Sequence, residues 1–131
     1  MLVGKALYVH QHRHAHMVCE LSPYGCMPNT MSVGAMANVL GRHPDLLYAP
    51  IEVKGDAEVH ALSRCQMVLT EAKKRAQREF DEVQARTGLA LDAARRSAAG
   101  ADVVRATFPI PHAGCAGTAA NTLLHLARVA H

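Results

Sequence analysis

The pattern that most constrains the fold of this chain is a stripe of apolar and small side chains between residues 56 and 87. The stripe consists of Leu62, Cys65, Leu69, Ala72, Ala76, Phe80 and Val83. Because these positions are three or four residues apart, a helix would place them all on one face. Asp56 and Glu58 fall in the first turn, where the helix dipole favours negative charge, and Gly88 is suited to end the helix. The pattern predicts a long amphipathic helix.

Three shorter elements precede this helix. Residues 15–21 are an apolar run that predicts a buried strand, residues 31–40 predict a helix, and residues 46–53 predict a second strand. Pro50 lacks a backbone N–H and therefore indicates a strand edge or a bulge. The order strand, helix, strand, helix favours a parallel pair of strands joined by a right-handed crossover.

The remaining residues predict a mixed tail. We expect a short helix over 89–99, an extended segment over 103–110 and a last helix over 117–130. The fold class is therefore α/β, a small parallel sheet with flanking helices in the order βαβα, followed by a helical tail. A length of 131 residues suits one domain over residues 1–131, or a fragment of a larger protein. Within it, residues 1–87 would form the βαβα unit and residues 88–131 the tail.

Composition excludes several function classes. Fourteen Lys and Arg against eleven Asp and Glu leave a net charge of only +3, too small to indicate a nucleic-acid partner. Aromatic residues make up 4% of the chain, too few for a base-stacking surface. No apolar run is long enough for a membrane span, and the first ten residues lack the features of a signal peptide. We therefore expect a cytoplasmic protein with no membrane partner.

The turn between the first strand and the first helix, residues 22–30, contains the most informative cysteine. In parallel sheets, ligands bind beyond the carboxyl ends of the strands, where this turn lies. Cys26 lies a few residues before the helix expected over 31–40, for which Asn29 or Thr30 could be the cap, and backbone N–H groups at a helix N-terminus stabilise a thiolate. Such a thiolate can ligate iron or zinc or act as a nucleophile. The alternative is a buried cysteine that packs in a tight turn.

The other three cysteines differ in their surroundings. Cys19 and Cys65 fall among apolar residues and are expected in the core. Cys115 lies in the small-residue segment HAGCAGT before the last helix, where it would face a ligand. The N–H groups of that segment would suit an anion, or the segment is simply a compact turn. It matches no nucleotide-binding motif, and the cysteine spacing matches no iron–sulfur motif.

A histidine-rich run offers a second kind of metal site. His10, His12, His14 and His16 alternate with other residues. On a strand, all four imidazoles would line one face and could bind zinc, nickel or copper. The alternative is a solvated polar lead-in to the first strand.

Residues 20–75 as a whole resemble the C-terminal region of acyl-CoA dehydratase activase-related proteins. The resemblance depends on the sequence Pro23-Tyr24-Gly25-Cys26-Met27-Pro28, a Pro-aromatic-Gly-Cys-Met-Pro turn after a strand. The tail sequence IPHAGCAGTAANTLLHLA, residues 110–127, also looks like the end of that region.

The resemblance implies a function that composition and spacing do not. Activators of this group hydrolyse ATP in an actin-like fold and send electrons from an iron–sulfur cluster to a dehydratase. This chain lacks an actin-like phosphate loop, so we expect it to be another part of such a system, with further subunits or domains as partners. It would contribute to iron–sulfur-dependent electron transfer or to dehydration of a 2-hydroxyacyl-CoA. Cys26 would be a ligand of the 4Fe-4S cluster or a nearby thiol, and Cys115 a second cofactor-binding residue.

Two alternatives remain open. The chain is a non-catalytic partner-docking domain whose cysteines all belong to the core, or it is a divalent-metal-binding protein that uses His10, His12, His14 and His16.

Overall fold

The computed structural model describes residues 2–55, 58–99, 102–105 and 107–129 and has the expected α/β class, with a parallel pair of strands, flanking helices and a helical tail. It divides into two compact units, Met1–Lys74 and Arg75–His131. The division lies within the long helix α3, Glu58–Thr87. Each unit is therefore described separately.

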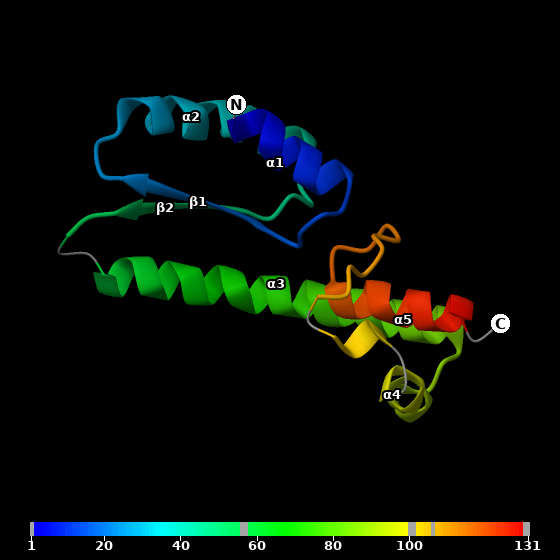
Figure 1. Ribbon diagram of the computed structural model, residues 1–131. Coiled ribbons are helices and arrows are strands. Elements are labelled where there is room, and N and C mark those ends of the chain that lie inside the picture. Colours follow the sequence, from blue (N-terminus) through cyan, green and yellow to red (C-terminus); the bar gives the residue numbers. More distant parts are fainter. Residues whose placement is uncertain (1, 56–57, 100–101, 106, 130–131) are drawn as a thin grey trace. The chain divides into compact units, whose positions relative to one another are not determined.

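The first unit contains the sheet. It begins with α1 (Leu2–Gln11), β1 (Val18–Pro23), α2 (Met27–Arg42) and β2 (Tyr48–Val53). β1 and β2 pair in parallel, with Val18 opposite Tyr48 at one end and Pro23 opposite Val53 at the other. Helices α1 and α2 lie together on one side of the two strands (Figure 1).

A small cluster holds these helices to the sheet. Its buried members are Ala6 from α1, Met36 from α2 and Leu46 from the segment before β2, and Val18 and Tyr48 pack against them. Val18 and Tyr48 are register partners, so this face of the sheet is the one that the helices cover. The same face also buries Glu20, since alternate residues of a strand point the same way.

Helix α1 was not expected from the sequence, and it ends in a defined motif. Arg13 adopts a left-handed conformation (φ 51°). Its N–H donates to the carbonyl of His10 (3.1 Å), and the His14 N–H donates to the carbonyl of Val9 (2.9 Å). These two bonds are those of a Schellman motif, which ends a helix by pairing its last carbonyls. Helix α1 is therefore capped at its C-terminal end.

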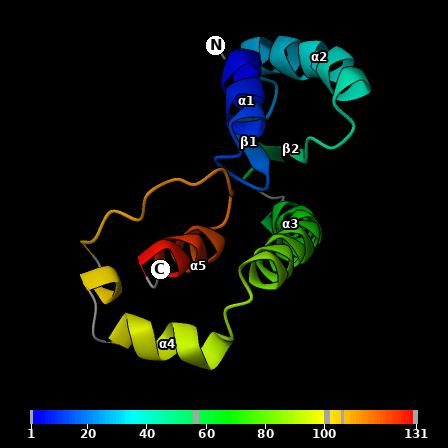
Figure 2. The ribbon, with the colours of Figure 1, turned by 90° about the vertical axis from the view of Figure 1, so that its right-hand side faces the viewer.

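The second unit is helical in the part that the structure describes. The end of α3 is followed by α4 (Leu91–Ala99), a 3₁₀ turn (Asp102–Val104) and α5 (Thr118–Val129). Figure 2 shows α5 beside the later turns of α3. Their contact is a buried cluster, which consists of Val83, Ala94, Cys115, Ala120, Leu123 and Leu126. The extended segment expected over 103–110 is wrong, because Val103 belongs to the 3₁₀ turn and packs against this cluster.

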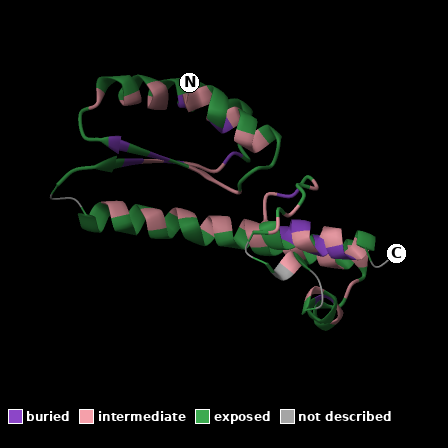
Figure 3. Cartoon of the chain, viewed as in Figure 1, coloured by how far each residue is buried: buried purple, intermediate pink, exposed green. Residues whose placement is uncertain are grey.

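The apolar stripe of α3 is buried over only half of its length. Val83 is 3% exposed and Phe80 packs beside it, whereas Leu62 and Leu69 are 56% and 45% exposed. Figure 3 shows the earlier turns of α3 as exposed or intermediate, and the buried residues of this helix, Glu79 and Val83, belong to its later turns. The helix itself was predicted correctly, but only the later part of its apolar stripe belongs to a buried cluster.

Candidate functional site

The Cys26 turn joins the carboxyl end of β1 to α2. Gly25 has a φ of +72°, a conformation that costs glycine little and other residues more. The turn closes through a hydrogen bond from the Cys26 N–H to the carbonyl of Pro23 (3.2 Å). A glycine before Cys26 therefore permits the sharp change of direction that leads into the helix.

Cys26 is the N-cap residue of α2. Its backbone is extended (φ −72°, ψ 105°), and its carbonyl accepts hydrogen bonds from both the N–H (3.0 Å) and the hydroxyl (3.1 Å) of Thr30. Its thiol caps no backbone N–H of the helix, and Pro28 occupies the first turn, where a missing N–H does no harm. The half-buried thiol therefore lies at the positive end of a 16-residue helix and beside the carboxyl edge of the sheet, as the sequence predicted.

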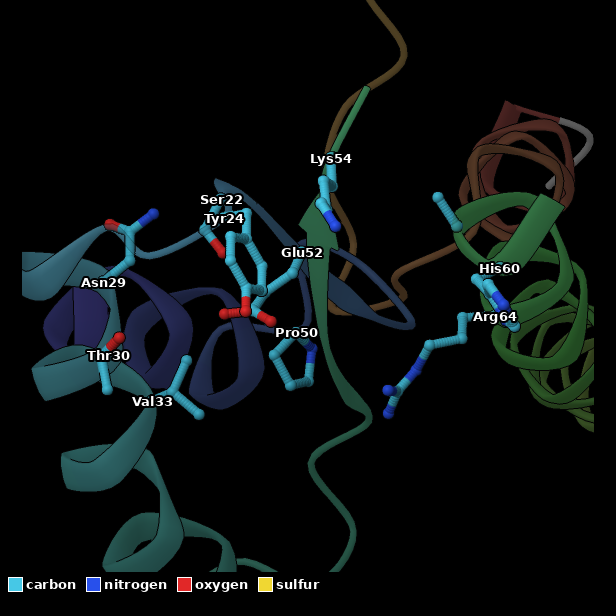
Figure 4. A pocket seen from close by; sticks show the side chains of 11 residues that line it. Ser22, Tyr24, Asn29, Thr30, Val33, Pro50, Glu52, Lys54, His60 and Arg64 are labelled. Atoms are coloured by element: carbon cyan, nitrogen blue, oxygen red, sulfur yellow. The ribbon is translucent and has the colours of Figure 1, made fainter. Parts of the chain in front are cut away.

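A pocket of about 460 Å³ opens at the same edge of the sheet. Its walls come from the ends of β1 and β2, the first turns of α2 and the beginning of α3 (Figure 4). Parallel α/β sheets bind their ligands at this edge. Cys26 belongs to the turn that borders the pocket, between the wall residues Tyr24 and Asn29.

The pocket walls carry more basic than acidic groups. Lys54 and Arg64 supply two cations and His60 an imidazole, against the single carboxylate of Glu52. The Lys54 ammonium lies 5.4 Å from the centre of the Tyr24 ring, within the range of a cation–π contact. This chemistry suits an anionic ligand that also presents apolar or aromatic surface. The sequence did not indicate these residues, because they become neighbours only when the carboxyl end of β2 meets the start of α3.

The other cysteines of the first unit were expected in the core, and the structure differs. Cys19 is exposed and Cys65 is half-buried. Partial burial raises the pKa of the Cys19 thiol, and the charge of the nearby Cys65 thiol raises it further. Since the thiolate is the form that binds metals and attacks electrophiles, Cys19 is poorly suited to either role at neutral pH.

The surroundings of Cys26 do not form a single-ion metal site in the described residues. Cys26 belongs there to no group of three or more cysteine, histidine or carboxylate ligands whose ligand atoms lie within 4.8 Å of one another. An iron–sulfur cluster is larger than one ion and is usually held by four thiolates.

The segment around Cys115 is a compact turn. The buried carboxylate of Glu79 accepts hydrogen bonds from the N–H groups of Ala116 (2.9 Å) and Gly117 (2.7 Å). Asn121 accepts one from the Ala113 N–H (2.8 Å) and donates another to the Cys115 carbonyl (2.8 Å). Cys115 is only 5% exposed and packs in the second cluster, so the position expected for an anion is taken by the protein's own carboxylate.

The histidine run does not form a strand. His10 lies in the last turn of α1, and His12 and His14 stack with Tyr8 at ring-centre distances of 4.2 and 5.5 Å. His16 follows in the loop that leads to β1. The arrangement with four imidazoles on one strand face is therefore absent from this described segment.

One of these histidines does meet other ligand groups. The ligand atoms of His10, His43 and Asp45 all lie within 4.8 Å of one another. The sequence did not predict this group, because the last two residues are 33 or more positions from His10 and reach it only through the packing of α1 on α2.

No family model, curated protein or solved structure matches this chain. None of the helices, over the residues described, has both the length and the apolar character needed to cross a membrane.

Proposed function

We propose that this chain is a partner-dependent part of an activase-related acyl-CoA dehydratase system and contributes one thiolate, that of Cys26, to iron–sulfur-dependent electron transfer or dehydration of a 2-hydroxyacyl-CoA. The observation that carries the proposal is the position of Cys26, at a helix N-terminus and beside the carboxyl edge of two parallel strands. The resemblance of residues 20–75 and 110–127 to that family supports it.

A partner is part of the proposal because an iron–sulfur cluster is usually held by four thiolates, and this chain has four cysteines of which Cys115 is buried in the second cluster. The partner, another subunit or domain of the same system, supplies the remaining ligands of the cluster. Its surface would cover the apolar side chains near the turn, such as Tyr24 (68% exposed) and Met27 (74% exposed). We propose the cytoplasm as the location, since reduced cysteines are typical of that compartment.

We propose the pocket beside the Cys26 turn as the binding site of the acyl-CoA. Coenzyme A carries phosphates and an adenine ring, which match the cations of Lys54 and Arg64 and the ring of Tyr24. A thioester held there would lie next to the Cys26 turn. Binding of coenzyme A to the chain, lost in an Arg64→Ala variant, would support this assignment, and unchanged binding in that variant would refute it.

The decisive experiment measures iron and acid-labile sulfide. The full chain is purified without oxygen, alone and after co-expression with the proteins encoded beside it, as the original protein and as Cys26→Ser and Cys65→Ser. We expect iron and sulfide only in the co-expressed complex, lost in Cys26→Ser and retained in Cys65→Ser. Iron that survives in Cys26→Ser, or a complex without iron, would contradict the role of Cys26.

The second candidate is a docking domain with no cofactor of its own. It is favoured by the number of large apolar side chains that the first unit exposes, including Leu21 (66%), Val59 (79%) and Met67 (67%). Recovery of a stable complex that contains no iron in either the original protein or Cys26→Ser would establish this function in place of the first.

A further inference from the structure

The turn between α2 and β2 holds two potential metal ligands in fixed positions. His43 is the C-cap residue of α2, and its N–H donates to the carbonyl of Val39 (2.9 Å). The Leu46 N–H then donates to the His43 carbonyl (3.0 Å), which closes a four-residue turn with Pro44 at its second position. Proline restricts the backbone of such a turn before any ligand binds. His43 and Asp45 are therefore presented by a rigid segment.

The core of the first unit brings His10 to this turn. Ala6 and His10 lie one helical turn apart, so they share a face of α1. Ala6 is 1% exposed and packs in the cluster that contains Leu46, the residue that follows Asp45. The contact that buries Ala6 therefore also positions His10 beside the turn.

The distances fit a tetrahedral ion. His10 Nε2 lies 3.3 Å from Asp45 Oδ2, and the His10 and His43 rings have centres 5.7 Å apart and planes inclined by 73°. A tetrahedral zinc ion with bonds of about 2.0 Å to nitrogen and oxygen holds two such ligands about 3.3 Å apart. An ion pair between His10 and Asp45 accounts for one of these contacts but not for the approach of His43.

We propose that His10, His43 and Asp45 form a binding site for a divalent transition-metal ion, with zinc as the ion that fits best. Two imidazoles and one carboxylate suit zinc and its neighbours, whereas calcium and magnesium prefer sites made of oxygen. The Asp45 side chain is 75% exposed and that of His10 21%, so the ion enters from solvent and keeps a coordination position for water.

The ion would connect α1 to the segment that precedes β2. Cys26 follows the carboxyl end of β1, whereas Asp45 precedes the amino end of β2, so in a parallel pair the two sites lie at opposite ends. The site is therefore independent of the proposed role of Cys26. Its effect is to stabilise a unit whose own apolar core is small.

The test is zinc titration of the metal-free full chain by calorimetry, with Co²⁺ as a second probe because its visible spectrum reports tetrahedral coordination. The variants are Asp45→Asn, which preserves the shape of the turn, and His43→Ala. The matched control is the triple variant His12→Ala, His14→Ala, His16→Ala, which removes the other histidines of the run. Circular dichroism checks that each variant is folded.

We expect one zinc ion per chain, a higher melting temperature with zinc, and binding weakened by more than about tenfold in Asp45→Asn and His43→Ala, since loss of a residue that merely supports a metal ligand already costs about that much. The triple variant should bind zinc like the original protein. Absence of zinc binding would overturn the proposal. So would binding that is unchanged in Asp45→Asn and His43→Ala but lost in the triple variant.

Discussion

The second unit gathers its buried apolar side chains in one cluster, whereas the first unit leaves many of its large apolar side chains exposed. Ten of the exposed large apolar residues belong to the first unit, namely Tyr8, Leu21, Tyr24, Met27, Met31, Val53, Val59, Leu62, Met67 and Leu69, against Leu91 and Val129 in the second. Exposed apolar side chains are the ones that a partner would cover. The partner that we propose would therefore make its apolar contacts mainly with the first unit.

The two units also differ in the hydrogen bonding of a buried glutamate. In the second unit both carboxylate oxygens of Glu79 accept backbone N–H groups. In the first unit one oxygen of Glu20 accepts the hydroxyl of Tyr48, and the other is buried without a hydrogen-bond partner. A buried polar atom left without a partner costs about 1–3 kcal/mol. The first unit therefore has a buried carboxylate oxygen without a hydrogen-bond partner in addition to its many exposed apolar side chains.

The largest expected effect is a difference in the free energy of unfolding between two variants, each of which replaces one leucine of one unit. Leu123→Ala should lower the free energy of unfolding by about 3 kcal/mol, because it opens a cavity in a buried cluster. Leu69→Ala should lower it by less than about 1 kcal/mol, since this leucine is 45% exposed. Urea unfolding of both variants tests the comparison, which fails if the two losses are equal.

The next effect concerns Glu79. Glu79→Ala removes the acceptor of two backbone N–H groups and should cost about 2 kcal/mol. Glu82→Ala is the control on the exposed side of the same helix and should change stability by less than about 0.5 kcal/mol. Equal unfolding midpoints for the two variants would show that the carboxylate does not hold the Cys115 turn.

A pH-dependent effect is expected in the first unit. Burial first, and then the hydrogen bond to the Glu20 carboxylate, raise the pKa of Tyr48. A raised pKa in the folded state means that the contribution to stability is complete below the ordinary tyrosine pKa of about 10 and is lost as the pH rises above it. Thermal unfolding between neutral and alkaline pH should show this decline.

Tyr48→Phe isolates the tyrosine from other groups that titrate in the same range, of which Cys19 is one. We expect this variant to lose about 1.5 kcal/mol at neutral pH, because Glu20 then has no hydrogen-bond partner, and to decline less steeply at alkaline pH. The same alkaline decline in Tyr48→Phe as in the original protein would assign the effect to another group.

The smallest expected effect is the difference in stability between alanine substitutions at two glycines of the first unit. Alanine at Gly25 would have to adopt a φ of +72° and should cost about 1 kcal/mol. Gly34 lies inside α2, and Gly34→Ala should stabilise the protein by about 0.5–1 kcal/mol. An added Cβ meets no atom within 4 Å at either position, so opposite shifts in melting temperature would report backbone conformation alone.

Local patterns predicted the elements of this fold better than their environments. The step of three or four residues correctly predicted α3, but the same step cannot distinguish Leu62, which is exposed, from Val83, which is buried. The environment depends on which elements fold back onto the helix, and the cluster that buries its later turns includes residues of α4 and α5.

The same limit applies to the candidate site. The position of Cys26 between the first strand and the first predicted helix could be predicted because the strand, the turn and the helix are consecutive in sequence. The pair formed by His10 and Asp45 was not, because it depends on the burial of Ala6 against Leu46. Helix α1 was missed for the same reason, since its short apolar segment lacks a capping signal at its start and gains stability from that packing.

The hydrogen bonds that Glu79 accepts from the N–H groups of Ala116 and Gly117, just before α5, also have a consequence for the order of folding. They join residues 37 and 38 positions apart, so a loop that includes all of α4 must close before they form. Contacts of such long range slow folding, because the entropy of loop closure is lost before the contact compensates for it. During synthesis these hydrogen bonds can form only after residues 116 and 117 have been added, long after the later turns of α3.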